Sequence, residues 1–82
     1  MDAAVKELVE LIAKSLVDRP DDVEVSVHEF DDEDRTLYEL SVAPDDLGKV
    51  IGRHGRTARS VRTILASAGL KLDRRIDFEI VE

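Results

Sequence analysis

A short stretch near the middle of the chain carries residue types suited to holding a phosphate. It reads Val50-Ile51-Gly52-Arg53-His54-Gly55-Arg56. The two glycines bracket a two-residue turn, and because they lack Cβ atoms they let the chain reverse sharply and let another backbone approach closely. The turn leads into a predicted helix, whose unpaired amide hydrogens and positive dipole end favour a phosphate. A tight glycine turn between helices also occurs for purely structural reasons, so this motif alone leaves both interpretations open.

Basic side chains surround this turn. Lys49, Arg53 and Arg56 lie within or beside it, and His54 could add a hydrogen bond to a phosphate or sugar. Along the helix that follows, Arg56, Arg59 and Arg62 share one flank. That flank carries no acid, whereas exposed helices more often mix both signs of charge. The pattern suits contact with a sugar–phosphate backbone, although an ordinary helix with a solvated arginine face would also show it.

Charge is segregated along the chain. The net charge is −7, from 12 basic and 19 acidic residues, which at first argues against a nucleic-acid partner. Residues 1–48 hold fifteen acids and four bases, residues 49–75 hold eight bases and one acid, and residues 76–82 hold three acids. Such segregation is expected if one face meets a polyanion and the rest repels it.

Composition predicts a single domain over residues 1–82 and excludes several other classes of protein. There is no cysteine, so disulfides and thiolate metal sites are excluded, and two histidines far apart do not form a metal-binding pattern. No apolar run approaches the roughly 20 residues of a membrane span. Charged residues such as Lys6 and Glu7 in the first helical stretch exclude a signal peptide. We therefore expect a cytoplasmic protein without a membrane partner.

Hydrophobic spacing predicts the element order α-β-β-α-α-β. We expect helices over about 3–17, 46–51 and 56–68, with Asp2 as the N-cap of the first and Gly69 as the residue that ends the last. We expect strands over about 23–28, 35–43 and 76–81, where apolar and polar residues alternate.

Connection lengths predict the topology. The four acidic residues 31–34 form a hairpin loop, so the first two strands should be antiparallel. About thirty residues separate the second and third strands, enough for a helical crossover that lays those strands parallel. The result is a two-layer α+β domain in which a three-stranded mixed sheet packs on three helices.

With this order, and with Ile51-Gly52-Arg53-His54-Gly55 matching Ile-Gly-x-x-Gly, the chain resembles a type II KH domain over nearly its whole length. It is most similar to short bacterial single-KH proteins of the KhpA type, through Asp46-Leu47-Gly48-Lys49-Val50-Ile51-Gly52 and Gly55-Arg56-Thr57-Ala58-Arg59.

The resemblance implies a groove for about four single-stranded nucleotides. One wall would be residues 46–68, and the other would be the third strand with a variable loop at about 69–75. Ile51 would contribute to the apolar floor, and Arg74 and Arg75 would overhang the far rim. Ala58 departs from the larger aliphatic residue found in many KH domains, which bears on groove depth.

The resemblance also implies partners and a role. These are single-stranded RNA, self-association and pairing with a KhpB (Jag)-type RNA-binding protein, in RNA chaperoning and post-transcriptional control of cell-wall growth and cell shape. It implies no cofactor and no small-molecule substrate.

Other classes of function fit the sequence less well. An enzyme is not expected, because the serines, histidines and surface carboxylates form no catalytic group. A helix-turn-helix DNA binder is disfavoured by the shortness of the helix over 46–51. The main alternative is a KH-like protein-interaction adaptor or ribosome-maturation factor with little affinity for free RNA. Phe30 and Leu37 fall opposite the expected core residues, and could either form an association patch or turn inward at a bulge.

Overall fold

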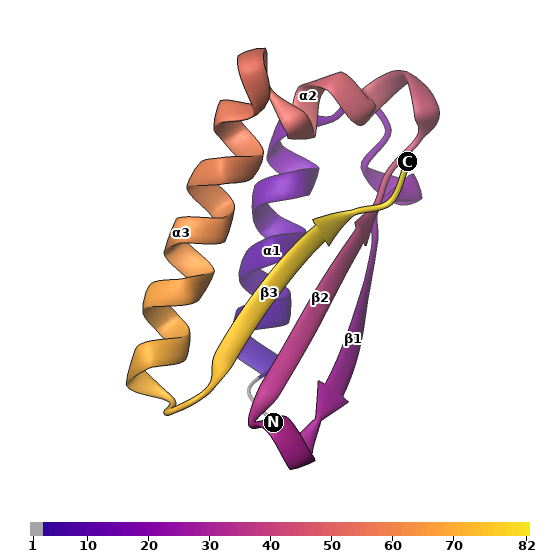
Figure 1. Cartoon of the computed structure of the whole chain (residues 1–82). Coiled ribbons are helices and arrows are strands. Elements are labelled where there is room, and N and C mark those ends of the chain that lie inside the picture. The colour runs from indigo at the N-terminus through magenta and orange to yellow at the C-terminus, as the bar shows by residue number, and fades with distance from the viewer. Residues whose placement is uncertain (1–2) are drawn as a thin grey trace.

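The computed structural model describes residues 3–82, which form a helical layer beside a three-stranded sheet (Figure 1). The elements are α1 (Ala3–Leu16), β1 (Glu24–Phe30), β2 (Arg35–Ser41), α2 (Leu47–Ile51), α3 (Arg56–Lys71) and β3 (Arg75–Ile80), with 3-10 turns at Pro20–Asp22, Asp31–Glu33, Pro44–Asp46 and Arg53–Gly55. The predicted α+β class and element order are confirmed, while the proposed N-cap Asp2 lies outside the described residues. No helix within residues 3–82 is both long enough and apolar enough to cross a membrane.

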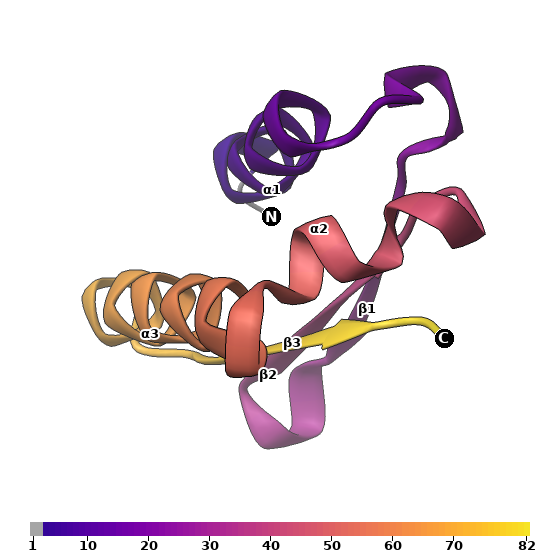
Figure 2. The same cartoon turned by 90° about the horizontal axis from the view of Figure 1, so that it is seen from above.

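The sheet has the strand order β1-β2-β3. β1 is antiparallel to β2, and β3 is parallel to β2, as the connection lengths predict. Seen from above, α1 and α3 lie on the same side of the sheet, and α2 lies between them at one end of the molecule (Figure 2). The acidic hairpin turn lies at the opposite end (Figure 1).

The core lies between the helices and one face of the sheet. Alternate residues of the strands, including Val25, Tyr38 and Phe78, are buried there against residues from all three helices. Tyr38, Leu65 and Val9 are among the most completely buried side chains. Alternation along the strands and 3.6-residue spacing along the helices therefore bring one apolar face of each element into a single core.

The outer face of the sheet carries Phe30 and Leu37. The β1–β2 register pairs residues one to one, with Phe30 opposite Arg35 and His28 opposite Leu37, so no bulge turns either side chain inward. Phe30 is 38% exposed, and the Arg35 guanidinium carbon lies 4.5 Å from the centre of its ring. This arginine also donates to Asp77 at 2.7 Å, and that hydrogen bond holds the pKa of the Asp77 carboxyl below its usual value. Part of the Phe30 ring is thus already covered within the chain.

The prediction that Gly69 ends the third helix is wrong. α3 continues to Lys71, and Gly69 is a buried helical residue without a positive φ. A Cβ at this position would collide with the backbone carbonyl oxygen of Arg74, and the Arg74 amide donates to the Gly69 carbonyl at 2.8 Å. Gly69 is therefore required for the close approach of the chain as it turns from α3 into β3.

Replacing Gly69 by alanine should destabilise the fold, with Gly48→Ala as the matched control. Overpacking at Gly69 is expected to cost about 1–3 kcal/mol. A Cβ at Gly48, inside α2, meets nothing within 4 Å, so alanine there should stabilise the protein by about 0.5–1 kcal/mol through the unfolded chain. Urea unfolding measures both changes. Equal stability of the two variants would contradict the role given to Gly69.

Candidate nucleic-acid interface

The loop between α2 and α3 has an unusual backbone. Three of its four residues have positive φ: Gly52 at 78°, His54 at 56° and Gly55 at 73°. The Gly55 amide donates to the Gly52 carbonyl at 3.0 Å, which closes the turn. A positive φ is uncommon for a residue other than glycine, although histidine, asparagine and aspartate adopt it more readily than most. The loop is therefore held in one sharp reversal at the start of α3.

The two glycines of the loop have different physical roles. A Cβ on Gly52 would lie 2.7 Å from the Cβ of Thr57 and would also collide with the Thr57 hydroxyl, so this position packs inward against α3. A Cβ on Gly55 would meet nothing within 4 Å. The backbone at Gly55 consequently faces open space, into which another backbone can approach.

The N-terminus of α3 lies directly behind this loop. Gly55 provides no side-chain cap, and the first turn of the helix holds no acid. Amide groups at a helix N-terminus without a side-chain cap are available to an outside acceptor, and the helix dipole favours an anion there. The structure therefore places an uncapped helix end beside the loop, and phosphate binding there stays a prediction.

Exposed basic side chains lie around the same point. Arg53, His54 and Arg56 are exposed, and none of their side chains forms a hydrogen bond or ion pair with any residue of the described chain. Arg59 reaches back to the His54 carbonyl at a long 3.5 Å. Arg62, further along the same flank, donates to the Phe78 carbonyl of β3 at 3.2 Å. The structure therefore brings four arginines of the predicted site to one side of α3.

A groove runs between α3 and β3 from this basic flank. Its upper part has a volume of about 470 Å³ and is lined by Arg35, Arg62, Ala66, Arg75, Ile76, Asp77, Phe78 and Glu79. Arg62 spans it from α3 to β3. Ile51 is half-buried at the end of α2, and Ala58 is buried.

Two predicted basic residues are engaged within the fold. Lys49 donates to Asp18 at 3.0 Å and Asp46 at 3.3 Å, so it does not point freely at the loop. The Arg74 side chain is 14% exposed, and its guanidinium donates to Thr36, Asp31 and the Arg35 carbonyl. This geometry corrects the expectation that Arg74 overhangs the rim.

Arg75, the other residue expected at the rim, lies at the end of α3 opposite the Gly52–Gly55 loop. Its side chain is 73% exposed and bonded to Asp77 at 3.1 Å.

Comparison with known proteins decides the family. The family model described as KhpA/KhpB, KH domain, matches residues 6–80. The chain belongs to the KhpA/KhpB family of KH domains. It is 52% identical over 77 residues to the RNA-binding protein KhpA of Halalkalibacterium halodurans, covering 94% of this chain and 99% of the relative. It is 49% identical over 80 residues to the RNA-binding protein KhpA of Aquifex aeolicus, covering 98% of this chain and 99% of the relative.

A solved structure shares the fold. The crystal structure of Aquifex aeolicus Era bound to GDP.AlF4- aligns with a TM-score of 0.59 and 18% identity, over 95% of this chain and 31% of that one. At this identity the likeness concerns the KH fold alone. The type II arrangement rests on the family match and on the element order described above.

Sequence reasoning missed the role of Asp46, which ties the start of α2 to the segment that follows α1. Asp46 is 1% exposed, and its carboxylate accepts hydrogen bonds from the backbone amides of Asp18 at 3.2 Å and Arg19 at 3.0 Å. Burial alone would raise the pKa of this carboxyl, but the two amides and Lys49 outweigh burial and hold it below its usual value. The Pro-Asp-Asp pattern indicated a turn before α2, but nothing in it indicated contacts 27 and 28 residues away.

Asp46→Asn should destabilise the KH domain in a pH-dependent way, with Asp45→Asn as its exposed control. Because the folded-state pKa of Asp46 is lowered, its contribution is present above the ordinary aspartate pKa of about 3.9 and is lost as pH falls through the folded-state pKa. Urea unfolding from pH 7 to pH 3 should show a gap between parent and Asp46→Asn that narrows in acid. A gap independent of pH, or an equal gap for Asp45→Asn, would contradict this assignment.

Proposed function

We propose that this chain is an RNA-binding protein that holds about four single-stranded nucleotides, beginning at the Gly52–Gly55 loop. The observation that carries the proposal is the loop itself. At one point, the helix N-terminus has no side-chain cap, the approach to Gly55 is open, and the Arg53 and Arg56 side chains have no partner among residues 3–82. Each favours a phosphate, and no acid of α3's first turn opposes it. The relatives named RNA-binding protein KhpA support the same function.

The proposed RNA path runs along the basic flank of α3. Arg53, Arg56 and Arg59 contact the backbone, and Arg62 lies over the groove beside Phe78 of β3. Ile51 contributes apolar surface under the bases. Gly52 and Gly55 set the backbone, and His54 contributes a hydrogen bond. Arg75 contacts the RNA at the far end, whereas Lys49 and Arg74 act mainly by holding Asp46 and the hairpin.

The family resemblance supports the wider role. We propose a cytoplasmic, non-enzymatic, single-domain protein that acts as an RNA chaperone and post-transcriptional regulator in cell-wall growth and cell shape. The adaptor alternative has less support, since it gives the Gly52–Gly55 loop and the basic side chains around it no function.

Replacing Arg53 and His54 together by aspartate should abolish RNA binding without unfolding the protein. Both side chains are exposed, so each change should cost no more than about 0.5 kcal/mol of stability. Aspartate tolerates the positive φ of position 54, and both glycines remain. Fluorescence anisotropy with single-stranded RNA should show at least a tenfold loss, while the parent should show a log–log salt slope of about −2 to −3 for three or four phosphates.

The matched control for this variant is Lys6→Glu with Lys14→Gln, an equal change in charge on the exposed side of α1. The control should retain most of the parent's affinity. Unchanged binding by the loop variant, or equal affinity of the parent for duplex and single-stranded RNA, would favour the adaptor alternative.

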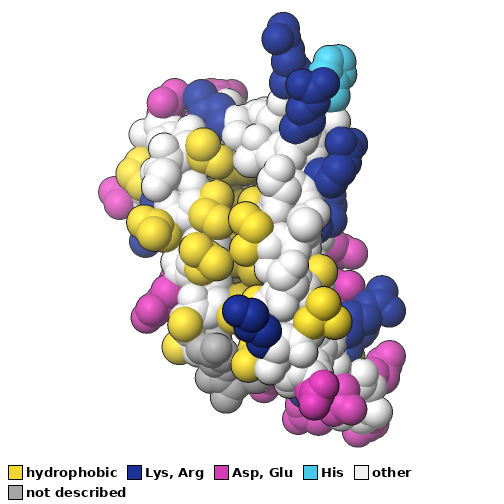
Figure 3. All heavy atoms as spheres, turned by 90° about the vertical axis from the view of Figure 1, so that its left-hand side faces the viewer, with side chains coloured by type: hydrophobic (Ala, Val, Ile, Leu, Met, Phe, Trp, Pro, Cys, Tyr) yellow, Lys and Arg dark blue, Asp and Glu magenta, His cyan; other side chains and the backbone are white. Residues whose placement is uncertain are grey.

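Self-association is the second part of the proposal, and an apolar groove between α1 and α3 supports it. Figure 3 shows hydrophobic side chains gathered in a strip there, away from the basic flank. Leu11 is 64% exposed and Ile64 is 50% exposed. The groove has a volume of about 490 Å³, and none of the described residues that line it is charged. A patch of this kind on so small a domain marks an association site, and a second copy can bury the same residues from both sides.

Leu11→Gln with Ile64→Gln should convert a dimer into a monomer while leaving the fold intact, because both side chains are exposed in the single chain. The control is Leu70→Gln, which removes an 82% exposed leucine on the α3–β3 side. Sedimentation at micromolar concentration measures the outcome. A strictly monomeric parent would leave a KhpB (Jag)-type protein as the proposed partner, and a pull-down that recovered none would contradict both.

A further inference from the structure

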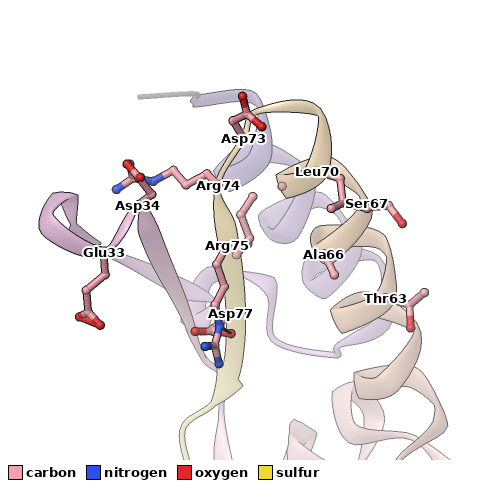
Figure 4. Close-up of a pocket in the computed structure, with 12 residues that line it drawn as sticks. Glu33, Asp34, Thr63, Ala66, Ser67, Leu70, Asp73, Arg74, Arg75 and Asp77 are labelled. Carbon is pink, nitrogen blue, oxygen red and sulfur yellow. Dashed lines mark hydrogen bonds and ion pairs between the residues drawn. The ribbon is translucent and has the colours of Figure 1, made fainter.

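The groove between α3 and β3 continues past the basic flank to the far end of the molecule. Its lower part has a volume of about 790 Å³ and shares Ala66, Arg75, Ile76 and Asp77 with the upper part. Figure 4 shows this lower part, with Thr63, Ala66, Ser67 and Leu70 on α3, and Glu33 and Asp34 on the hairpin at the other side of β3. α3 has 16 residues and is about 24 Å long. The helix is therefore long enough for bound RNA to continue along it into the lower part of the groove.

The sign of the charge reverses along this groove. Three arginines and two acids line the upper part. Two arginines and four acids line the lower part: Arg74, Arg75, Glu33, Asp34, Asp73 and Asp77. One of those arginines, Arg74, already donates hydrogen bonds to Thr36, Asp31 and the Arg35 carbonyl.

Three of the lower acids have no partner of their own in the described chain. Glu33, Asp34 and Asp73 are exposed and form no hydrogen bond or ion pair through their side chains there, whereas Asp77 is bonded to Arg35 and Arg75. We call Glu33, Asp34 and Asp73 the acidic rim. Two of them stand on positive-φ backbone, Asp34 at 50° and Asp73 at 55°, at the ends of the turns that border the groove. Lys71 and Arg75 are the exposed bases near this rim, and Arg75 is already paired with Asp77.

We infer that the acidic rim ends the RNA path and restricts the footprint to the nucleotides that fit between the Gly52–Gly55 loop and Arg75. This inference rests on the proposed function. A phosphate entering the lower groove would approach unpaired carboxylates, and like charges at short range repel. The rim thus acts as a repulsive element that determines footprint length, while the arginines of α3 supply the attraction.

The test compares two variants that change the net charge equally. The rim variant carries Glu33→Gln, Asp34→Asn and Asp73→Asn, and asparagine tolerates the positive φ at positions 34 and 73. Asp31 is kept because it holds Arg74. The control variant carries Asp21→Asn, Asp22→Asn and Asp45→Asn, which are exposed acids at the other end of the sheet. Thermal melting by circular dichroism establishes that both fold.

The measurement is anisotropy with mixed-sequence single-stranded RNAs of six and twelve nucleotides. For a site of about four nucleotides, counting registers alone gives about a threefold gain in affinity with the longer strand. The control variant should show the same gain as the parent, even if its overall affinity rises. The rim variant should gain at least about tenfold, with a salt slope steeper by about 0.7 for each added phosphate. Bridging of two grooves in a dimer would affect both variants alike, so the difference between them decides.

Equal length dependence in the two variants would overturn the inference and leave the proposed function standing. If the parent protein binds no RNA at all, both the inference and the proposed function are overturned. If the rim variant does not fold, nuclease protection of a twelve-nucleotide RNA by the parent gives the answer instead. A protected stretch of about four or five nucleotides supports the rim, and protection extending well beyond that contradicts it.

Discussion

The position of the Gly52–Gly55 loop depends on one buried carboxylate. Asp46 accepts the backbone amides of Asp18 and Arg19 where the chain leaves α1, and it does so immediately before α2 begins. α2 has only five residues, too few to be stable through its own hydrogen bonds. Lys49, on the next turn, bonds both Asp46 and Asp18 and closes the same cluster. Tertiary anchoring, rather than helix propensity, therefore holds the segment that presents Gly52.

Because α2 is anchored in this way, the domain can hold the loop in a conformation with three positive φ angles. The loop has positive φ at Gly52, His54 and Gly55 with no ligand present, and Gly52 packs closely against Thr57. A loop already in its binding conformation loses little conformational entropy on binding. A small entropy loss would favour the proposed binding of a short RNA segment, because a site of this size makes few contacts.

The fold could be predicted from the sequence because its information is local. The alternation through Tyr38 and Leu40, and the helical spacing through Val61 and Leu65, determine which face is buried wherever the elements end up. Contacts between residues in different elements could not be predicted in the same way. A glycine at position 69 is typical of a helix end. Its role here is instead to leave room for the carbonyl oxygen of Arg74, five residues later and across a turn.

The same limit applies to the basic residues of the site. In the sequence alone, paired and unpaired arginines and lysines cannot be distinguished, and each counts as one positive charge. The structure separates Arg53, which is unpaired within the described chain, from Arg74 and Lys49, whose charges are bound to acids brought from distant elements. Pairing of this kind depends on register and on loop direction, and neither can be read from spacing along one element.

Helix α3 combines three surfaces that would otherwise compete. Leu65 is fully buried in the core, Ile64 is half exposed toward α1, and Arg62 reaches the edge of β3. At 100° per residue, positions 62 and 64 differ by about 200°, so they face nearly opposite directions. A dimer formed through the Ile64 side consequently leaves the Arg62 groove open in each copy. Two short grooves on one particle raise the effective concentration of the second for a strand bound at the first, which compensates for the small number of contacts in each.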